Sequence, residues 1–390
     1  MKFARAAGFC CALLLPLTAA AEFKILLGFD PADDSGKQDM AFGVAAAPSL
    51  SAALGTKVSL NQTTNLTDAM RASRTQENDA IIAPPHVTAS AVSHNYQLIA
   101  RDPKNASYVL VARKEIARIE DIAGKRLYLT QQDSVRAYLA KGLLTEAGFS
   151  SKSFKQTVYG KTSGAGLFAL ASNLADVTVA EQAEAQTWIS SHPGVAAILK
   201  TSRPVPEGMA LMVRKNLAEG DRKKLLKWIT SFDTNSSGIG KLQLTTAADE
   251  EQYRYIASLG ILTPASLSGV QRVTASEVVK LMANGAVAVD TRTPKEYQLA
   301  HITGSINAPY VERSLKDRDF DSALDDFSAI TALPKDKPTI FFCNGPECWK
   351  SYKASKIALA NGMKQVYWFR GGEPEWQEQS RPVAGTGSSK

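Results

Sequence analysis

The sequence is poor in the residue types that build disulfide frameworks and metal sites. Its 390 residues include 4 cysteines and 4 histidines, and the histidines are scattered along the chain. Scattered histidines offer no metal-ligand spacing, and the sequence also lacks a dinucleotide-binding glycine motif. We therefore expect neither a metal nor another cofactor.

Blocks of basic residues are also missing. The formal net charge is +7, but the lysines and arginines are spread over the whole chain. Nucleic-acid binding usually needs a clustered basic patch, so we do not expect a nucleic-acid partner. A mild attraction for anionic small molecules remains compatible with this charge.

Long apolar runs are confined to the N-terminus. Residues 1–21 combine Lys2 and Arg5 with a short apolar stretch at 9–17 and small residues at 18–21, the pattern of a cleavable secretory signal peptide. The run is short for a bilayer crossing, and no later stretch resembles a transmembrane helix. We expect an exported, periplasmic protein with no transmembrane segment in its mature chain.

Cleavage would leave two cysteines, Cys343 and Cys348. An even pair in an oxidising compartment is often a disulfide, and two buried cysteines are the other plain explanation. A bridge across so short a loop constrains little of the chain, so a structural disulfide explains the pair weakly. A redox or sulfur-handling pair explains it better.

The residues around Cys343 predict a strand, a tight loop and a helix. Residues 339–342 are apolar and β-prone, 344–346 are turn-forming, and helical spacing runs from 349 to 360. Loop N–H groups and a helix N-terminus both favour negative charge, so they lower a thiol pKa and can hold a persulfide or oxyanion.

Two domains are expected from the length and from the order of elements. Strand and helix patterns alternate from residue 23, including a helix at 40–54, and predict an α/β fold with a mostly parallel sheet. Small polar residues at 265–269 mark a boundary. We place the first domain at 22–264 and the second at 270–384, where a Thr274–Glu277 capping box opens a helix that ends at Asn284 and Gly285.

Residues 23–235 resemble, in the order of their segments, a periplasmic solute-binding protein of the phosphonate-binding type. The matching pieces are residues 78–86, 107–113, 119–135, 144–148, 170–176 and 202–214. This resemblance implies two α/β lobes that close by hinge motion on a small, anionic ligand. Its ligand loops match Pro85, His86, Ser134, Val135, Thr162, Ser163 and Glu181.

Some of these positions allow other roles. The Ser134 hydroxyl either caps a helix or holds an anion, and His86 is either a ligand contact or a surface loop residue. A small, flexible loop usually follows the serine in this family, whereas this chain has Val135, Arg136 and Ala137. That departure argues against phosphonate itself, so the resemblance does not name the ligand.

Residues 270–384 resemble a rhodanese domain. The matching features, in order, are Asp290 and Arg292, Glu296 and Tyr297, residues 301–309, the Cys343 loop, and residues 370–376. The resemblance implies a parallel sheet and a sulfurtransferase, with thiosulfate or a persulfide as donor and a thiol, possibly on a protein, as acceptor. Cys343 would carry the persulfide in a loop of Asn344, Gly345, Pro346, Glu347, Trp349 and Lys350, with Asp290, Arg292 and His301 as supports.

Three residues of this loop leave alternatives open. Cys348 either resolves the persulfide or packs at the helix start, and Lys350 either attracts an anionic donor or is a solvated surface lysine. Glu347 would place negative charge inside a loop made for anions, which disfavours thiosulfate. No arginine ends the loop, which argues against a phosphatase. The rival to an enzyme is a solute-binding or sensor protein with little turnover.

Overall fold

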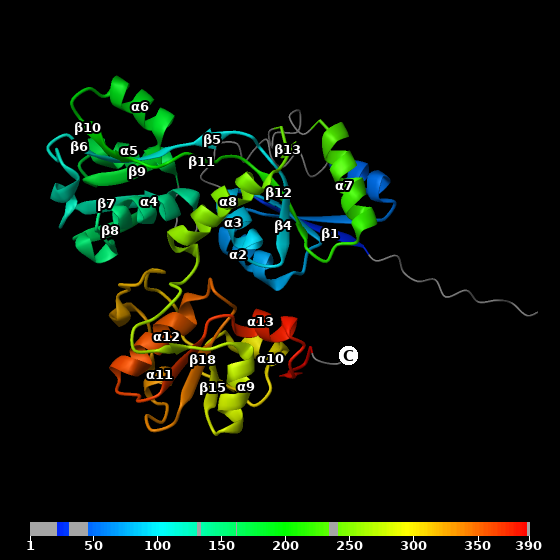
Figure 1. Ribbon diagram of the computed structural model, residues 1–390. Coiled ribbons are helices and arrows are strands. Elements are labelled where there is room, and N and C mark those ends of the chain that lie inside the picture. Colours follow the sequence, from blue (N-terminus) through cyan, green and yellow to red (C-terminus); the bar gives the residue numbers. More distant parts are fainter. Residues whose placement is uncertain (1–21, 31–45, 131–133, 161, 234–240, 388–390) are drawn as a thin grey trace, which may run out of the picture.

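The computed structural model describes residues 22–30, 46–130, 134–160, 162–233 and 241–387 (Figure 1). The predicted signal peptide at 1–21 lies outside these residues. Of the helix expected at 40–54, residues 46–54 are described, and they are helical. None of the helices in the described part of the chain has the length and apolarity that a bilayer crossing requires.

The first lobe is a six-stranded sheet with helices on its faces. Its helices are α2 (Leu66–Thr75), α3 (Pro85–Val92) and α7 (Glu219–Ser231). In spatial order, its strands are β13 (Gln243–Leu244), β4 (Tyr96–Arg101), β12 (Ala210–Arg214), β3 (Ala80–Ala83), β1 (Phe23–Gly28) and β2 (Val58–Thr63).

The second lobe has a five-stranded sheet and three helices, α4 (Val135–Glu146), α5 (Ser163–Ala171) and α6 (Gln182–Ser191). In spatial order, its strands are β10 (Ala196–Thr201), β6 (Tyr108–Arg113), β9 (Val177–Glu181), β7 (Arg126–Thr130) and β8 (Gln156–Gly160). Short 3-10 turns are η1 (Ile119–Ile122) and η2 (Ser151–Ser153).

These two sheets are mixed, whereas we expected mostly parallel ones. Strand β1 pairs in parallel with β2 and β3, but β12 runs antiparallel to both β3 and β4. Strand β12 is the return crossing from the second lobe, so it enters the first sheet in the opposite direction. In the second lobe, β6 likewise runs antiparallel to β9 and β10.

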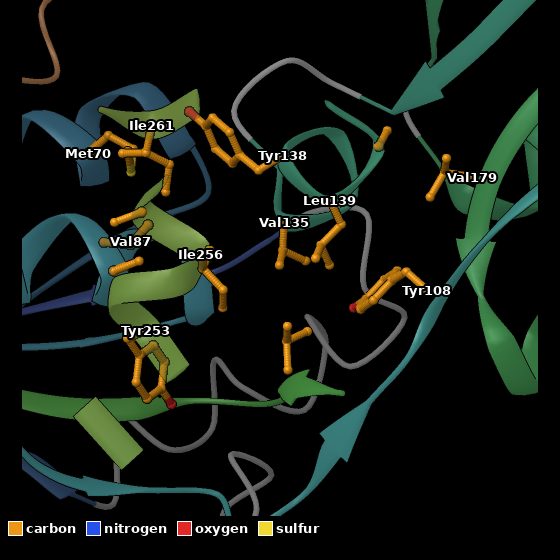
Figure 2. Close-up of a cluster of buried hydrophobic side chains, with 14 of the residues drawn as sticks. Met70, Val87, Tyr108, Val135, Tyr138, Leu139, Val179, Tyr253, Ile256 and Ile261 are labelled. Atoms are coloured by element: carbon orange, nitrogen blue, oxygen red, sulfur yellow. The ribbon is translucent and has the colours of Figure 1, made fainter. Parts of the chain in front are cut away.

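The two lobes share a continuous apolar core. The chain passes between them in the antiparallel pair β5 (Asn105–Ala106) and β11 (Val205–Pro206). Helix α8 (Ala247–Ile256) and the following turn η4 (Ala257–Ile261) then pack against both lobes (Figure 1). Figure 2 shows Val87 of α3 and Ile256 of α8 on one side of this core and Val135 of α4 on the other.

The C-terminal domain is an α/β unit whose paired strands are all parallel within its main sheet. In spatial order, the strands are β14 (Gln271–Arg272), β19 (Val366–Phe369), β18 (Thr339–Phe342), β15 (Val287–Asp290) and β17 (Ile306–Asn307). The other elements are α9 (Ala275–Ala283), α10 (Pro294–Leu299), η5 (Ser322–Leu324), α11 (Ser328–Thr331), α12 (Trp349–Ala360) and α13 (Gly372–Glu378), with the small pair β16 (His301–Ile302) and β20 (Val383–Ala384).

Local sequence signals set several helix ends. Thr274 and Glu277 form the predicted capping box of α9, which ends at Asn284 and then Gly285 with φ of 86°. Thr246 and Asp249 form a second box at the start of α8. Each box satisfies N–H groups that the first helical turn leaves unpaired.

Candidate functional site

Cys343 stands directly after β18, at the carboxyl end of the central parallel strands. All four residues of β18 are buried. The carbonyl oxygen of Phe342 accepts hydrogen bonds from the Thr291 amide at 3.1 Å and from its hydroxyl at 3.0 Å. The loop therefore begins from a rigid point in the sheet.

The two cysteines are joined as a disulfide, with their Cα atoms 6.0 Å apart. Cys343 is only 2% exposed, whereas Cys348 is partly exposed. A turn closes the loop, because the Cys348 amide donates to the Gly345 carbonyl at 3.0 Å. The disulfide alternative from the sequence is thus realised, in a loop that opens on β18 and ends at α12.

Gly372 brings a second loop against the Cys343 backbone. Its φ is 59°, and a Cβ there would overlap the Cys343 carbonyl oxygen, so the position requires glycine. The close approach lets the Glu373 amide donate to that oxygen at 2.9 Å. The glycine pair at 371 and 372 therefore fixes the start of the cysteine loop.

Arg292 and Asp290 support the loop from the side of β15. The Arg292 guanidinium donates to Asp290 at 2.6–3.0 Å and to the Ala300 carbonyl at 2.8 Å, and it lies 3.5 Å from Asn344 Oδ1. Burial alone would lower the pKa of Arg292, but the hydrogen bonds and the charge of Asp290 outweigh it and raise that pKa. The pair is a buried, charged brace behind Asn344.

The remaining supports hold the neighbouring loop. Asn344 Nδ2 donates to Glu296 Oε1 at 2.6 Å. His301 Nδ1 lies 2.7 Å from the Tyr297 carbonyl, and the two rings stack. These contacts tie the cysteine loop to α10 and to the segment that follows it.

The side chains of the first two residues of α12 are held by contacts within the C-terminal domain. Trp349 is buried against Tyr352. Lys350 is half-buried and donates from Nζ to the Tyr310 carbonyl at 2.8 Å, and burial lowers its pKa. Lys350 is therefore not the freely solvated lysine that we weighed for this position.

Two residues expected in the anion cradle face the N-terminal domain instead. The Pro346 carbonyl accepts from the Thr263 amide at 2.7 Å and from its hydroxyl at 2.6 Å. The Glu347 carboxylate leaves the loop and contacts side chains of α2, α3 and the segment after α3. The expected charge inside the loop is absent because this carboxylate is bound elsewhere.

The Glu347 partners all come from the N-terminal domain. Oε2 lies 3.1 Å from Arg74 Nη1 and 2.8 Å from Ser90 Oγ, and Oε1 lies 3.0 Å from His94 Nε2. Burial alone would raise the pKa of Glu347, but His94, Arg74 and Ser90 outweigh it and lower that pKa to about 2. No pattern in the sequence indicated these partners.

A cavity of about 610 Å³ lies between the two domains beside this contact. Its walls are mostly charged and amide side chains. Its lining includes Arg71 and Arg74 on α2, with Arg292, Asn344, Glu373 and Glu378 on the C-terminal domain. The cavity reaches Asn344, the residue that follows Cys343.

The predicted ligand residues of the N-terminal domain lie mostly at helix starts. Pro85 and His86 form the first turn of α3 and are buried, and the His86 ring is 6.4 Å from the ring of Tyr138 on α4. Ser134 caps α4, since its Oγ accepts from the Ala137 amide at 3.2 Å. His86 is therefore not a surface loop residue, and Ser134 has the capping role.

Three further positions complete this set. Val135 is buried in the shared core beside Tyr108 and Leu139 (Figure 2). Glu181 caps α6, and its carboxylate accepts from the Ala183 and Glu184 amides at 3.0 Å each. Ser163 begins α5, after Thr162 as its N-cap residue, but the Ser163 side chain lies outside the described part.

A metal centre is not formed by the part of the chain that the structure describes, because no three histidine, cysteine or acidic side chains gather there. The groups that gather are instead the disulfide loop, its supports and the interdomain carboxylate. A cysteine pair in a loop at the end of a strand is an arrangement suited to sulfur or thiol chemistry.

Comparison with family models identifies both halves of the chain. Residues 44–261 match the phosphonate ABC transporter periplasmic substrate-binding protein family, and residues 274–379 match the rhodanese-like domain. The first match spans more than half of the chain.

Individual proteins agree with this division. The thiosulfate sulfurtransferase GlpE of Ectopseudomonas mendocina is 32% identical over 111 residues, which are 28% of this chain and 88% of that protein. The thiosulfate:glutathione sulfurtransferase of Saccharomyces cerevisiae is 29% identical over 119 residues, 28% of this chain and 81% of that protein.

A solved structure matches the front of the chain. XAC2383 from Xanthomonas citri bound to ATP superposes with a TM-score of 0.50 at 11% identity, covering 60% of this chain and 96% of that one. At this identity the likeness shows the fold alone. The chain thus belongs to the phosphonate-type periplasmic substrate-binding protein family, and a rhodanese-like domain with sulfurtransferase relatives follows at its C-terminal side.

Proposed function

We propose that this protein is a periplasmic sulfurtransferase that moves sulfane sulfur through a Cys343 persulfide to a thiol or similar acceptor. The observation that carries the proposal is the position of Cys343, at the end of β18 in a short loop that leads into α12, within a rhodanese-like domain. In this proposal the domains run from 22 to 264 and from 270 to 384, and the signal peptide at 1–21 directs export and is then cleaved.

The reaction proceeds in two nucleophilic steps. The Cys343 thiolate attacks the outer sulfur of thiosulfate, the S–S bond of the donor breaks, and sulfite leaves with the bonding electron pair. A persulfide donor reacts in the same way and releases a thiolate. The acceptor thiolate then attacks the outer sulfur of the Cys343 persulfide, which returns Cys343 as a thiolate.

The loop environment stabilises the charged states. Amides between Asn344 and Cys348 and the N-terminus of α12 favour negative charge on the sulfur. The brace of Arg292 on Asp290 holds Asn344 in place. Because Lys350 is tied to the Tyr310 carbonyl, it contributes charge near the helix start without reaching freely for a donor.

Cys348 acts as a resolving cysteine when no acceptor reaches the Cys343 persulfide. Its thiolate attacks the inner sulfur of the Cys343 persulfide, a Cys343–Cys348 disulfide forms, and hydrosulfide leaves. Such a step would yield the same Cys343–Cys348 bridge that the structure contains, which supports this part of the proposal. A dithiol reductant is then needed before the next cycle.

The N-terminal domain binds a small, anionic ligand between its lobes. The proposed set at the starts of α3 and α4 is Pro85, His86, Ser134 and Val135, and Ser134 would act there in addition to capping α4. Helix N-termini favour anions, and buried Val135 adds an apolar wall. Ser163 and Glu181 are further members of this set.

A second candidate function is a sensor of redox state or sulfur with little turnover. The disulfide and the 2% exposure of Cys343 favour it, because an oxidised and buried nucleophile cannot turn over. In that case the N-terminal domain serves uptake or signalling.

Intact-mass measurement separates the two. The full chain is reduced, freed of reductant and treated with thiosulfate or a polysulfide, with Cys343→Ser and Cys348→Ser alongside. We expect the Cys348→Ser protein to gain the mass of one sulfur atom and keep it, and the Cys343→Ser protein to gain none. The unaltered protein should gain it and then pass to the disulfide.

Failure of every donor to add sulfur to Cys348→Ser would refute the sulfurtransferase and favour the sensor. A sulfur adduct that persists equally in the unaltered protein would refute only the resolving role of Cys348.

A further inference from the structure

Glu347 attaches the cysteine loop to the N-terminal domain. Its side chain is 2% exposed, although it belongs to a loop at the domain boundary. A charge buried this deeply requires hydrogen-bonding partners, and Arg74, Ser90 and His94 supply them at 2.8–3.1 Å. The N-terminal domain thus carries a built receptor for this carboxylate.

A second contact holds the loop beside Glu347. Thr263, just after α8 and η4, donates two hydrogen bonds to the Pro346 carbonyl. Arg370 of the C-terminal domain donates to the Thr263 carbonyl at 2.7 Å and lies 3.1 Å from its hydroxyl. The N-terminal domain therefore binds the loop at two consecutive residues, Pro346 and Glu347.

The docked loop leaves Cys343 almost fully buried. Cys343 is 2% exposed, and a Cβ on Gly345 would lie 3.6 Å from the His94 ring, so the N-terminal domain packs directly on the loop. Thiol–disulfide exchange needs an attacking thiolate to reach one sulfur of the bridge. In the docked loop, only the partly exposed Cys348 offers a surface for that approach, and the loop has little freedom to move.

The receptor shares a helix with the proposed ligand site. Helix α3 begins with Pro85 and His86 and carries Ser90 in its last turns, with His94 two residues beyond its end. The C-terminal domain also contacts the second lobe, since Lys141 of α4 donates from Nζ to the Lys316 carbonyl at 3.2 Å. Hinge motion between the lobes would therefore act on this docking.

We propose that the N-terminal domain is a latch on the cysteine loop, closed by Glu347 on Arg74, Ser90 and His94, and that the closed latch protects the Cys343–Cys348 disulfide from reduction. The inference rests on the proposed function, in which this loop handles sulfur. Opening the latch frees the disulfide and allows the next catalytic cycle to begin.

A dithiol reduces the Cys343–Cys348 disulfide in two exchange steps. One thiolate of the reductant attacks the Cys348 sulfur, the more exposed of the two, and the Cys343 thiolate leaves with the electron pair. The second thiol of the reductant then attacks the mixed disulfide and releases Cys348. Two electrons and two protons pass from the dithiol, which becomes a cyclic disulfide.

The test measures how fast dithiothreitol reduces the oxidised full chain. Samples are quenched with iodoacetamide, and intact mass reports the fraction alkylated at both cysteines. We expect Arg74→Gln to be reduced roughly tenfold faster, the factor that corresponds to about 1.4 kcal/mol of lost docking free energy. Glu347→Gln should behave similarly, and Arg74→Lys should regain part of the protection.

The matched control is Arg71→Gln, on the same helix one turn earlier. Arg71 is half-exposed and lies 3.8 Å from Asp68 across a helical turn. Its substitution should leave the reduction rate within about twofold, as expected for a surface pair. Ser90→Ala, which removes one neutral donor, covers the case that Arg74→Gln fails to fold.

Reduction of folded Arg74→Gln and Glu347→Gln at the rate of the unaltered protein would overturn the latch. If Arg74→Gln does not fold, an unaltered rate in both Ser90→Ala and Glu347→Gln would overturn it. This readout follows the disulfide and not sulfur transfer, so a failed latch leaves the sulfurtransferase to its own mass test, and a failed sulfurtransferase leaves the latch testable.

Discussion

Glu347→Gln should change how the stability of the protein depends on pH. Glu347 is almost fully buried, and its pKa falls from an ordinary 4.5 to about 2. Because the folded-state pKa is the lower one, the stabilisation is present at neutral pH and is lost as the pH falls through the folded-state value. A shift of this size corresponds to about 3 kcal/mol at neutral pH.

The expected difference follows from that linkage. Glutamine imitates the protonated carboxyl, so the variant should be less stable by about 3 kcal/mol at neutral pH but by only about half of that near pH 3. The gap should close as the pH approaches 2. Above about pH 5 the carboxyl is ionised in both folded and unfolded chains, so its own titration no longer changes the gap.

Urea unfolding followed by tryptophan fluorescence measures this gap. Trp349, Trp368 and Trp376 lie in the C-terminal domain and report its transition. Glu378→Gln, an exposed glutamate at the same boundary hydrogen-bonded to Asn95, is the control and should show no such pH dependence. An equal gap at neutral pH and near pH 3 would refute the reasoning that Glu347 is ionised and buried against Arg74.

Two further substitutions test the C-terminal domain. Gly372→Ala should lower the stability by about 1–2 kcal/mol, because alanine is strained in a left-handed backbone, and should also displace the Cys343 carbonyl and slow sulfur transfer. Gly362→Ala, which also has a left-handed backbone but has open space around it, should lower only the stability. Thermal unfolding and transfer rates compare the two variants. Lys353→Met should lower the free energy of unfolding in urea by about 3–5 kcal/mol, because the buried carboxylate of Asp325 loses its cation and the 2.7 Å ion pair of Lys353 with Glu312 is lost. Lys356→Met, one turn away and partly exposed, should lower it by less than about 1 kcal/mol. Equal losses in the two variants would contradict the argument.

Much of the local structure could be predicted because its determinants are adjacent in the chain. Thr274 reaches Glu277 within one turn, and the residues after β18 turn at Gly345 with φ of 90°. The cysteine loop, its neighbouring strand and its following helix depend on such short-range chemistry. The order of motifs along the chain was then enough to indicate both families.

The tertiary structure alone decided where Glu347 points. Its partners Arg74, Ser90 and His94 lie 273, 257 and 253 residues earlier in the chain, and no local pattern links such positions. From the sequence alone, we expected the charge of Glu347 to lie inside the loop and to repel anionic sulfur donors. Packing of one domain on the other turned the same carboxylate outward, because a buried charge is stable only where cations and donors meet it.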